Sequence, residues 1–325
     1  MRYSVLPAAL LALAAHAAVA QNPDLILSKA QRDSILKTYK NRFPIWGRKA
    51  IEKGFDLPAP VGLGVNIVYA DQDITLSQLG LSTGSNPTVP TEFIQFGRVQ
   101  APVFTGNLRG DLWLFPFLNV YAMVGAARVS TDVTVVEPLT FQTKVDQNGQ
   151  YAGLGMTGTM GIKHNWLALD VNWAWTQTEK LDEPVNTRIF GIRYGRAQKL
   201  RGSQRLAFWL GAMHQKLNSG TKGSINLSEV IAGGGGDLGD YQDSPWYEDL
   251  TPAQKQVVDA IAERLAGRDP SDVIVNYSLQ KKVADPWNML AGVSYDFSRR
   301  WQARVESGFI GRFQVLGQLN YRFDW

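Results

Sequence analysis

The side chains that could carry out acid–base or metal chemistry are scarce in this sequence. There is no cysteine, which excludes disulfides, thiol catalysis and thiolate metal sites. Only two histidines follow residue 20: His164 stands in a predicted turn, and His214 near the end of a predicted strand. They are not at metal-ligand spacing, and neither belongs to a recognisable serine nucleophile motif. We therefore favour a structural role for both histidines.

An enzymatic alternative would combine His214 with an acidic residue of the longest loop, either Asp237 or Asp240. The two aspartates belong to a glycine-rich acidic segment that could bind calcium through oxygen ligands. The segment lacks the regular ligand spacing of a dedicated calcium loop, so we favour an external loop whose glycines raise chain entropy. No strand, glycine loop and helix follow in the order that a phosphate-binding motif needs. The sequence predicts no catalytic residue, no metal site and no cofactor.

Charged residues of both signs share the polar faces of the predicted strands. Buried charges of opposite sign normally pair, so we expect these side chains to crosslink a narrow interior and to leave no open pore. A pathway for a substrate is the alternative. The overall balance of 33 Lys and Arg against 29 Asp and Glu is too small to indicate nucleic acid as a partner. The predicted interior set comprises Arg109, Asp111, Asp170, Arg193, Arg304, Glu306, Arg322 and Asp324.

The strands that would position these charges are recognised by their alternation. In residues 313–325, apolar and aromatic side chains occupy one face and polar side chains the other, with Leu316 as the one apolar residue on the polar face. Nine further segments alternate in the same way or with lower contrast. The ten predicted strands cover 61–69, 104–114, 118–129, 151–163, 166–176, 189–194, 205–213, 289–297, 301–309 and 313–325.

Ten strands fit the even strand number of single-chain bacterial barrels, with 8–12 as the range the sequence allows. If the C-terminus is periplasmic, the short turns near 116, 164, 197–203 and 298 are periplasmic too. The opposite side then receives the mostly long connections at 72–99, 138–149, 177–185 and 217–286, with a tight turn at 310–312 as the exception. The alternation is weak around 75–81 and 273–282, where an extra hairpin could lie.

The N-terminus indicates export. A short positive start, an apolar run and the small-x-small site Ala18-Val-Ala20 together predict a signal peptide over 1–20, so that the mature chain begins at Gln21. No later segment has the roughly 18 uninterrupted apolar residues that a membrane helix needs. An exported chain that is also embedded in lipid must then close its backbone hydrogen bonds as a barrel.

Two segments do not have the pattern of a barrel wall. Residues 21–60 are charged and helical in pattern until Pro44, and could form a periplasmic arm or a plug inside the lumen. In the loop 217–286, Thr251 and Gln254 resemble a capping box, and the apolar spacing that follows predicts a helix over 252–266. The predicted organisation is therefore a signal peptide, a helical segment, and an antiparallel transmembrane β-barrel over 61–325.

The chain resembles bacterial outer-membrane β-barrel proteins. The resemblance rests on the signal peptide, the alternating strands and the terminal Tyr321-Arg-Phe-Asp-Trp325, which looks like the aromatic signal recognised by the barrel-assembly machinery of Gram-negative bacteria. Residues 286–301 also look like uncharacterised proteobacterial members of this group. The resemblance implies a cell outer-membrane location, contact with lipid, and recognition by the assembly machinery through Tyr321, Phe323 and Trp325.

The resemblance names no activity. The function we favour is a structural, surface-interaction or binding role for a barrel with a narrow, charge-filled lumen. The alternatives are a channel or transporter for small solutes, and a barrel enzyme that hydrolyses lipid or peptide. A soluble secreted barrel with an apolar ligand inside would require the apolar faces to point inward.

Overall fold

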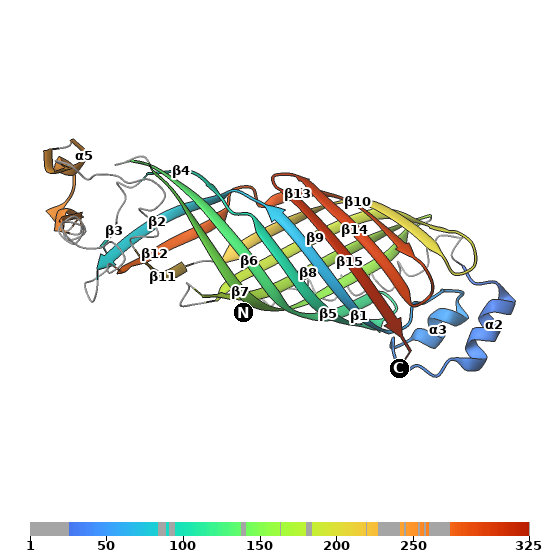
Figure 1. Cartoon of the computed structure of the whole chain (residues 1–325). Helices are drawn as coiled ribbons and strands as arrows, with labels where there is room; N and C mark the ends of the chain where they lie inside the picture. Colours follow the sequence, from blue (N-terminus) through green and yellow to red (C-terminus); the bar gives the residue numbers. More distant parts are fainter. Residues whose placement is uncertain are drawn as a thin grey trace, which may run out of the picture.

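Ten antiparallel strands of this computed structural model pair in a closed ring, and Figure 1 shows them as a long, tilted barrel. Consecutive ring strands are neighbours, and β1 pairs with β15 to close the wall. Each strand contains the core of one of the ten predicted segments, so the predicted fold class is confirmed. The ring consists of β1 (Val61–Asp71), β5 (Val103–Phe115), β6 (Leu118–Glu137), β7 (Phe141–Ile162), β8 (Asn165–Thr178), β9 (Val185–Lys199), β10 (Arg205–Asn218), β13 (Trp287–Asp296), β14 (Trp301–Ile310) and β15 (Phe313–Phe323).

The structure describes most of the chain outside the N-terminus and the longest loop. The predicted signal peptide, Asp237, Asp240 and Trp325 lie outside the described residues, as does much of the predicted helix 252–266. No helix among the described residues is long and apolar enough to cross a membrane. The described ranges are 26–83, 89–90, 95–137, 141–162, 164–179, 184–218, 220–226, 241–243, 245–252, 254–256, 258–259 and 274–324.

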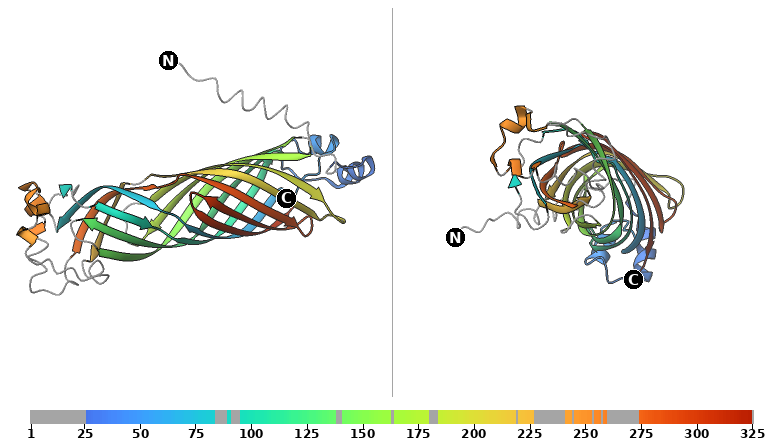
Figure 2. Two further views of the ribbon diagram at one scale, coloured as in Figure 1. Left: turned by 90° about the horizontal axis from the view of Figure 1, so that it is seen from above. Right: turned by 60° about the vertical axis from the view of Figure 1, so that its left-hand side comes forward.

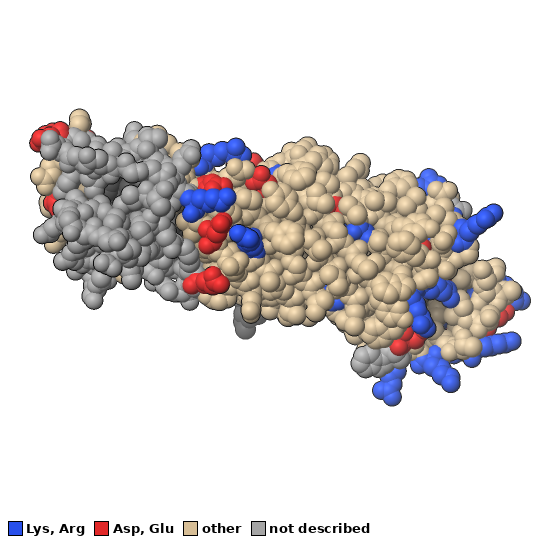
Figure 3. All heavy atoms as spheres, viewed as in Figure 1, with Lys and Arg blue, Asp and Glu red and all other residues tan. Residues whose placement is uncertain are grey.

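The two faces of the wall follow the predicted alternation. Outward side chains are apolar and exposed, such as Leu63, Leu108 and Leu210, whereas inward ones such as Asp170 and Glu306 are buried. Figure 3 shows the result as a surface dominated by uncharged residues along the barrel, with charged residues gathered toward its ends. Because the apolar faces point outward, the alternative of a soluble barrel with an apolar interior is wrong.

Two ring strands are much longer than the alternation predicted. β6 has 20 residues and β7 has 22, and they pair continuously from Leu118 with Gly158 to Val135 with Phe141. Most of the predicted connection 138–149 is therefore strand. About 9–11 tilted residues suffice to cross a bilayer, so this part of the wall extends beyond the membrane on the long-loop side.

A small second sheet continues the wall on that side. Its order is β11 (Gly220–Asn226), β12 (Ile274–Val283), β2 (Ile74–Thr83) and β3 (Val89–Pro90), while β4 (Gln95–Gln100) pairs with the far end of β6. Residues 75–81 and 274–282 are strand, and they pair with each other outside the ring. Ile74, Val99 and Ala101 form a buried apolar cluster between these strands. We call this part the extracellular extension.

The loop between β11 and β12 contains short helical elements. They are the 3-10 turn η2 (Tyr241–Asp243) and the helix α5 (Pro245–Glu248). Thr251 and Gln254 make both hydrogen bonds of the predicted capping box. The described residues that follow, 252, 254–256 and 258–259, are helical.

The N-terminal segment forms two helices at the opposite end, α2 (Lys29–Thr38) and α3 (Gly47–Glu52). Ser28 and Gln31 form a capping box that begins α2. Figures 1 and 2 show both helices beyond the ends of the strands, near the C-terminus. Following the orientation that the loop lengths favour, we call this end of the barrel the periplasmic end. The described residues of this segment therefore lie at the rim, outside the lumen.

Candidate functional site

The densest polar cluster of the lumen surrounds Glu306 of β14, of which 1% is exposed. Arg193 of β9 donates to its carboxylate from Nε to Oε2 at 2.7 Å and from Nη2 to Oε1 at 2.8 Å. Arg304 Nη2 and Trp209 Nε1 each donate to Oε2 at 2.7 Å. Arg193 also pairs with Asp170 of β8. Charge-assisted and bidentate hydrogen bonds are the strong ones in proteins, so this cluster ties β8, β9, β10 and β14 together across the interior.

A second cluster surrounds Asp111 of β5, nearer the periplasmic end. Its Oδ1 accepts from Arg322 Nη2 and from Asn119 Nδ2, both at 2.7 Å. Arg109 Nη2 in turn donates to Asn119 Oδ1 at 3.1 Å. Arg322 Nη1 also donates to the backbone oxygen of Ala59 at 3.0 Å, which ties the N-terminal segment to the lumen cluster.

Tyr121 of β6 joins the two clusters. The guanidinium of Arg109 lies 3.6 Å from the centroid of the Tyr121 ring, within cation–π range. The Tyr121 hydroxyl is hydrogen-bonded to Asn172, and Asn172 Nδ2 donates to Asp170 Oδ2 at 3.0 Å. A continuous chain of contacts therefore crosses the interior from Arg322 to Arg304. In a ten-strand barrel the interior is close to the size that side chains can fill.

Large lumen side chains are accommodated by glycines at the paired position of the adjacent strand. Trp209 of β10 lies against Gly292 of β13, and a Cβ at Gly292 would overlap the indole ring. Gly155 of β7 leaves room in the same way for the Tyr121 ring. Large side chains thus fill the interior, and glycines in the wall leave room for them.

Seven of the eight charges predicted to line the lumen belong to this network. The eighth, Asp324, is a correction: it follows the last residue of β15, is exposed, and accepts from Asn41 Nδ2 at 3.0 Å. The predicted strand continues to residue 325, whereas β15 ends at Phe323, so Asp324 lies outside the paired strand. The predicted set also lacks the uncharged members of the network, Trp209, Tyr121, Asn119 and Asn172. Asn172 shares a strand face with Asp170, whereas none of the predicted lumen charges lies on β6 or β10, the strands that contain the other three.

The histidines are far less connected. His164 is exposed in the turn between β7 and β8. His214 faces outward and packs edge-on against Trp287, with 5.0 Å between ring centroids. Among the described residues, no group of three or more His, Asp or Glu side chains could hold a metal ion. The absence of catalysis stays a prediction, because the partner acids proposed for His214 lie outside the described ranges.

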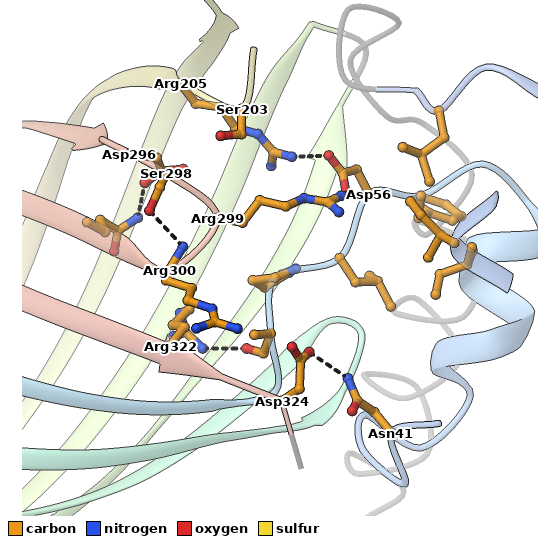
Figure 4. A pocket seen from close by; sticks show the side chains of 18 of the residues that line it. Asn41, Asp56, Ser203, Arg205, Asp296, Ser298, Arg299, Arg300, Arg322 and Asp324 are labelled. Atoms are coloured by element: carbon orange, nitrogen blue, oxygen red, sulfur yellow. Dashed lines mark hydrogen bonds and ion pairs between the residues drawn. The ribbon is translucent and has the colours of Figure 1, made fainter. Parts of the chain in front are cut away.

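A cavity of about 330 Å³ lies between the N-terminal segment and the periplasmic rim. Figure 4 shows that its labelled lining residues come from both parts: Asn41 and Asp56 from the N-terminal segment, and the arginines from the ends of the strands. We call it the rim cavity. Its arginines are Arg205, Arg299, Arg300 and Arg322, and its aspartates are Asp56, Asp296 and Asp324.

Asp56 fastens the N-terminal segment over this cavity. Its Oδ1 accepts from Arg299 Nη2 at 2.5 Å, and its Oδ2 pairs with Arg205. On the barrel side, Gln302 Nε2 donates to Asp296 Oδ1 at 2.7 Å. On the segment side, burial and the nearby carboxylate of Asp324 raise the pKa of Tyr39 above its ordinary value. The phenol therefore stays protonated at neutral pH and can donate a hydrogen bond, which it does to the backbone oxygen of Phe43 at 3.3 Å.

The closed ring, the apolar outward faces and the aromatic residues at the periplasmic rim define an integral outer-membrane β-barrel. Trp301 and Tyr321 of that rim face outward and contact each other edge-on, with ring centroids 4.9 Å apart. Aromatic girdles at the interfaces are characteristic of such barrels. The chain is therefore a protein of the cell outer membrane.

Comparison with known proteins adds solved barrels of the same class. The β domain of the Bordetella autotransporter BrkA shares 10% identity at a TM-score of 0.35, with 81% of this chain and 100% of that chain covered. OprG of Pseudomonas aeruginosa shares 11% at 0.38, covering 82% and 98%. The toluene transporter TbuX of Ralstonia pickettii shares 9% at 0.29, covering 82% and 90%. No protein-family model and no curated protein matches the sequence.

Proposed function

We propose that this chain is a closed, non-conducting outer-membrane barrel with a structural or binding role at the cell surface. The observation that carries the proposal is the polar network that crosses the lumen from Arg322 to Arg304. A solute would have to break several charge-assisted hydrogen bonds at once to pass. Buried charges that lose their partners cost several kcal/mol each, so thermal opening of this network is rare.

The extracellular extension supports the second half of the proposal. Strands β6 and β7 carry the wall past the membrane, and β2 and β12 continue it, with the buried apolar cluster of Ile74, Val99 and Ala101 between β2 and β4. Paired strands are rigid compared with loops, so the extension fixes the ends of β11 and β12, between which the long connection runs, at a set height above the membrane. A surface-interaction role would use that connection and the extension below it.

Ion conductance in planar bilayers tests the proposal directly. The purified wild-type barrel is expected to be silent. A variant with both Arg193→Ala and Glu306→Ala removes the centre of the network and is expected to produce conducting events. The matched control, Leu210→Ala, changes an outward-facing side chain and is expected to stay silent. Steady wild-type conductance would refute the closed barrel and favour the small-solute channel.

An enzymatic role is the weaker alternative. It would rely on His214, whose described contact is the ring of Trp287. Any hydrolysis of lipid or peptide by the wild type that disappears in His214→Ala would favour it over the role we propose. Activity that His214→Ala leaves unchanged would exclude the site.

A further inference from the structure

We propose that the rim cavity binds an amphiphile, with an anionic head group at Arg300 and an apolar chain against the N-terminal segment. The head group is a carboxylate or a phosphate, the anions that a guanidinium recognises best. Arg322 belongs both to the lumen network and to the cavity lining, but the head-group position at Arg300 lies outside that network, so a barrel that conducts or is silent could equally possess the site.

Arg300 differs from the other arginines of the cavity. Arg205 and Arg299 share Asp56, and Arg322 pairs with Asp111. The guanidinium of Arg300 donates a hydrogen bond from Nη1 to the Tyr321 hydroxyl at 3.2 Å. Among the described residues, no carboxylate lies within ion-pair distance of it.

The nearby acids of the cavity are engaged elsewhere. Asp324 accepts from Asn41, and Asp296 accepts from Gln302. Figure 4 shows Arg300 among the residues that line the cavity, with Arg322 on the neighbouring end of β15. An anion at Arg300 would accept the guanidinium donors that the hydrogen bond to Tyr321 does not use.

The opposite wall of the cavity is apolar. It is formed by side chains of the N-terminal segment, among them Leu27, Ile35, Ile51 and Leu57. Leu27 and Ile51 are themselves buried, at 7% and 2% exposed, which fixes this wall in place. A volume of about 330 Å³ falls at the lower end of the range for small-molecule sites. A medium-length chain with one charged end suits both walls.

The position of the cavity indicates where such a ligand comes from. Trp301 lines the cavity and also belongs to the outward aromatic pair with Tyr321. Aromatic pairs of this kind lie at head-group level in membrane proteins. Arg300 is therefore within reach of a lipid head group of the adjoining leaflet, and of a soluble carboxylate in the aqueous space below it.

Equilibrium binding tests the proposal on the full mature chain in an uncharged detergent. The probe is a dansyl-labelled undecanoate, whose emission rises in an apolar site. We expect saturable binding by the wild type, displacement by octanoate, and no comparable displacement by octanol, which lacks the charge. Arg300→Gln is expected to weaken probe binding roughly tenfold or more, the effect of losing a charge-assisted contact. Ile35→Asn, on the apolar wall, is expected to weaken it as well.

The matched control is Arg201→Gln, because Arg201 is an exposed arginine of the β9–β10 turn at the same end and does not line the cavity. It is expected to bind the probe as the wild type does. Circular dichroism and heat-dependent mobility on denaturing gels establish that each variant is folded. The proposal is overturned if the wild type does not bind saturably, if folded Arg300→Gln binds equally well, or if octanol competes as strongly as octanoate.

Competition also distinguishes the two sources of ligand. Dihexanoyl phosphatidylglycerol carries the phosphate of a membrane lipid on short chains. If it displaces the probe at lower concentration than octanoate, the ligand is a phospholipid of the adjoining leaflet. If octanoate is the better competitor, the ligand is a soluble carboxylate. In both cases the dependence on Arg300 must hold.

Discussion

Trp209 and Leu210 are neighbours in the chain but lie in opposite surroundings. Trp209 points into the lumen, is 5% exposed and donates its indole N–H to Glu306, whereas Leu210 points outward and is 64% exposed. The inner face of each strand is held by hydrogen bonds and ion pairs among side chains. Apolar side chains of the outer face such as Leu210 have no group that can make such bonds, and they are stable only where lipid covers them.

The comparison shows that substitutions on the two faces of the barrel wall destabilise it for opposite reasons. On the inner face, removing a charge is costly because its partners stay buried without it. On the outer face, adding a charge is costly because lipid cannot solvate it. The inner and outer faces can therefore be tested by separate variants of the same few strands.

The largest effect is expected for Glu306→Ala. This change leaves Arg193, Arg304 and the Trp209 N–H without their shared acceptor inside the barrel. Breaking one side of a buried ion pair typically costs about 3–5 kcal/mol, and we expect a loss in this range in the free energy of unfolding. Denaturant unfolding of the barrel in phospholipid vesicles, followed by tryptophan fluorescence, measures it.

The control for this variant is Glu306→Gln, which keeps the shape and an acceptor oxygen but removes the charge. It is expected to lose less stability than Glu306→Ala. Equal stability of Glu306→Ala and the wild type would show that the lumen network does not hold the barrel together.

The outer face is tested by Leu210→Arg. Leu210 lies in the middle of β10, between Tyr194 of β9 and Ala291 of β13. An arginine facing lipid near the bilayer midplane costs about 2–4 kcal/mol. The same vesicle unfolding assay is expected to show this loss, and Leu210→Ala a smaller one. A stable Leu210→Arg barrel would mean that this face does not contact lipid.

The contact between the inner side chains and the wall is tested by Gly292→Val. The added methyl groups would occupy the space of the Trp209 indole and push it away from Glu306. Overpacking of this kind costs about 1–3 kcal/mol. Gly106→Val is the matched control, because a Cβ at Gly106 meets no atom within 4 Å. Similar unfolding free energies for the two variants would show that the Trp209 contact is not tight.

The ring strands could be predicted from the sequence because lipid and lumen impose opposite polarity on alternate residues, as in Val305 and Glu306. The full length of β6 and β7 could not. Beyond the membrane neither face meets lipid, so alternation fades around residues such as Asp132 and Lys144, which pair with each other in the long hairpin.

Most of the charged residues that line the lumen could be predicted, but the hydrogen bonds and ion pairs among them could not. Arg193 and Glu306 are 113 residues apart, and their meeting depends on the stagger of the strands around the ring. The rim cavity was also beyond prediction, because it exists only where the N-terminal segment packs on the ends of distant strands. Asp56, which fastens that segment, stands in a stretch with no strand or helix pattern.

The smallest effect is expected at the periplasmic rim, where side chains face water instead of lipid or the barrel interior. Asp56→Asn removes the carboxylate shared by Arg205 and Arg299, of which Arg299 is more than half exposed. Partly exposed pairs contribute about 1 kcal/mol or less and are weakened by salt. We expect unchanged unfolding of the barrel but faster proteolysis between residues 26 and 60, with the difference from the wild type shrinking at high salt.

Asp33→Asn, on the exposed face of α2, is the control and is expected to be cleaved as the wild type is. If Asp56→Asn instead destabilised the whole barrel as much as Glu306→Ala, the rim would belong energetically to the lumen network.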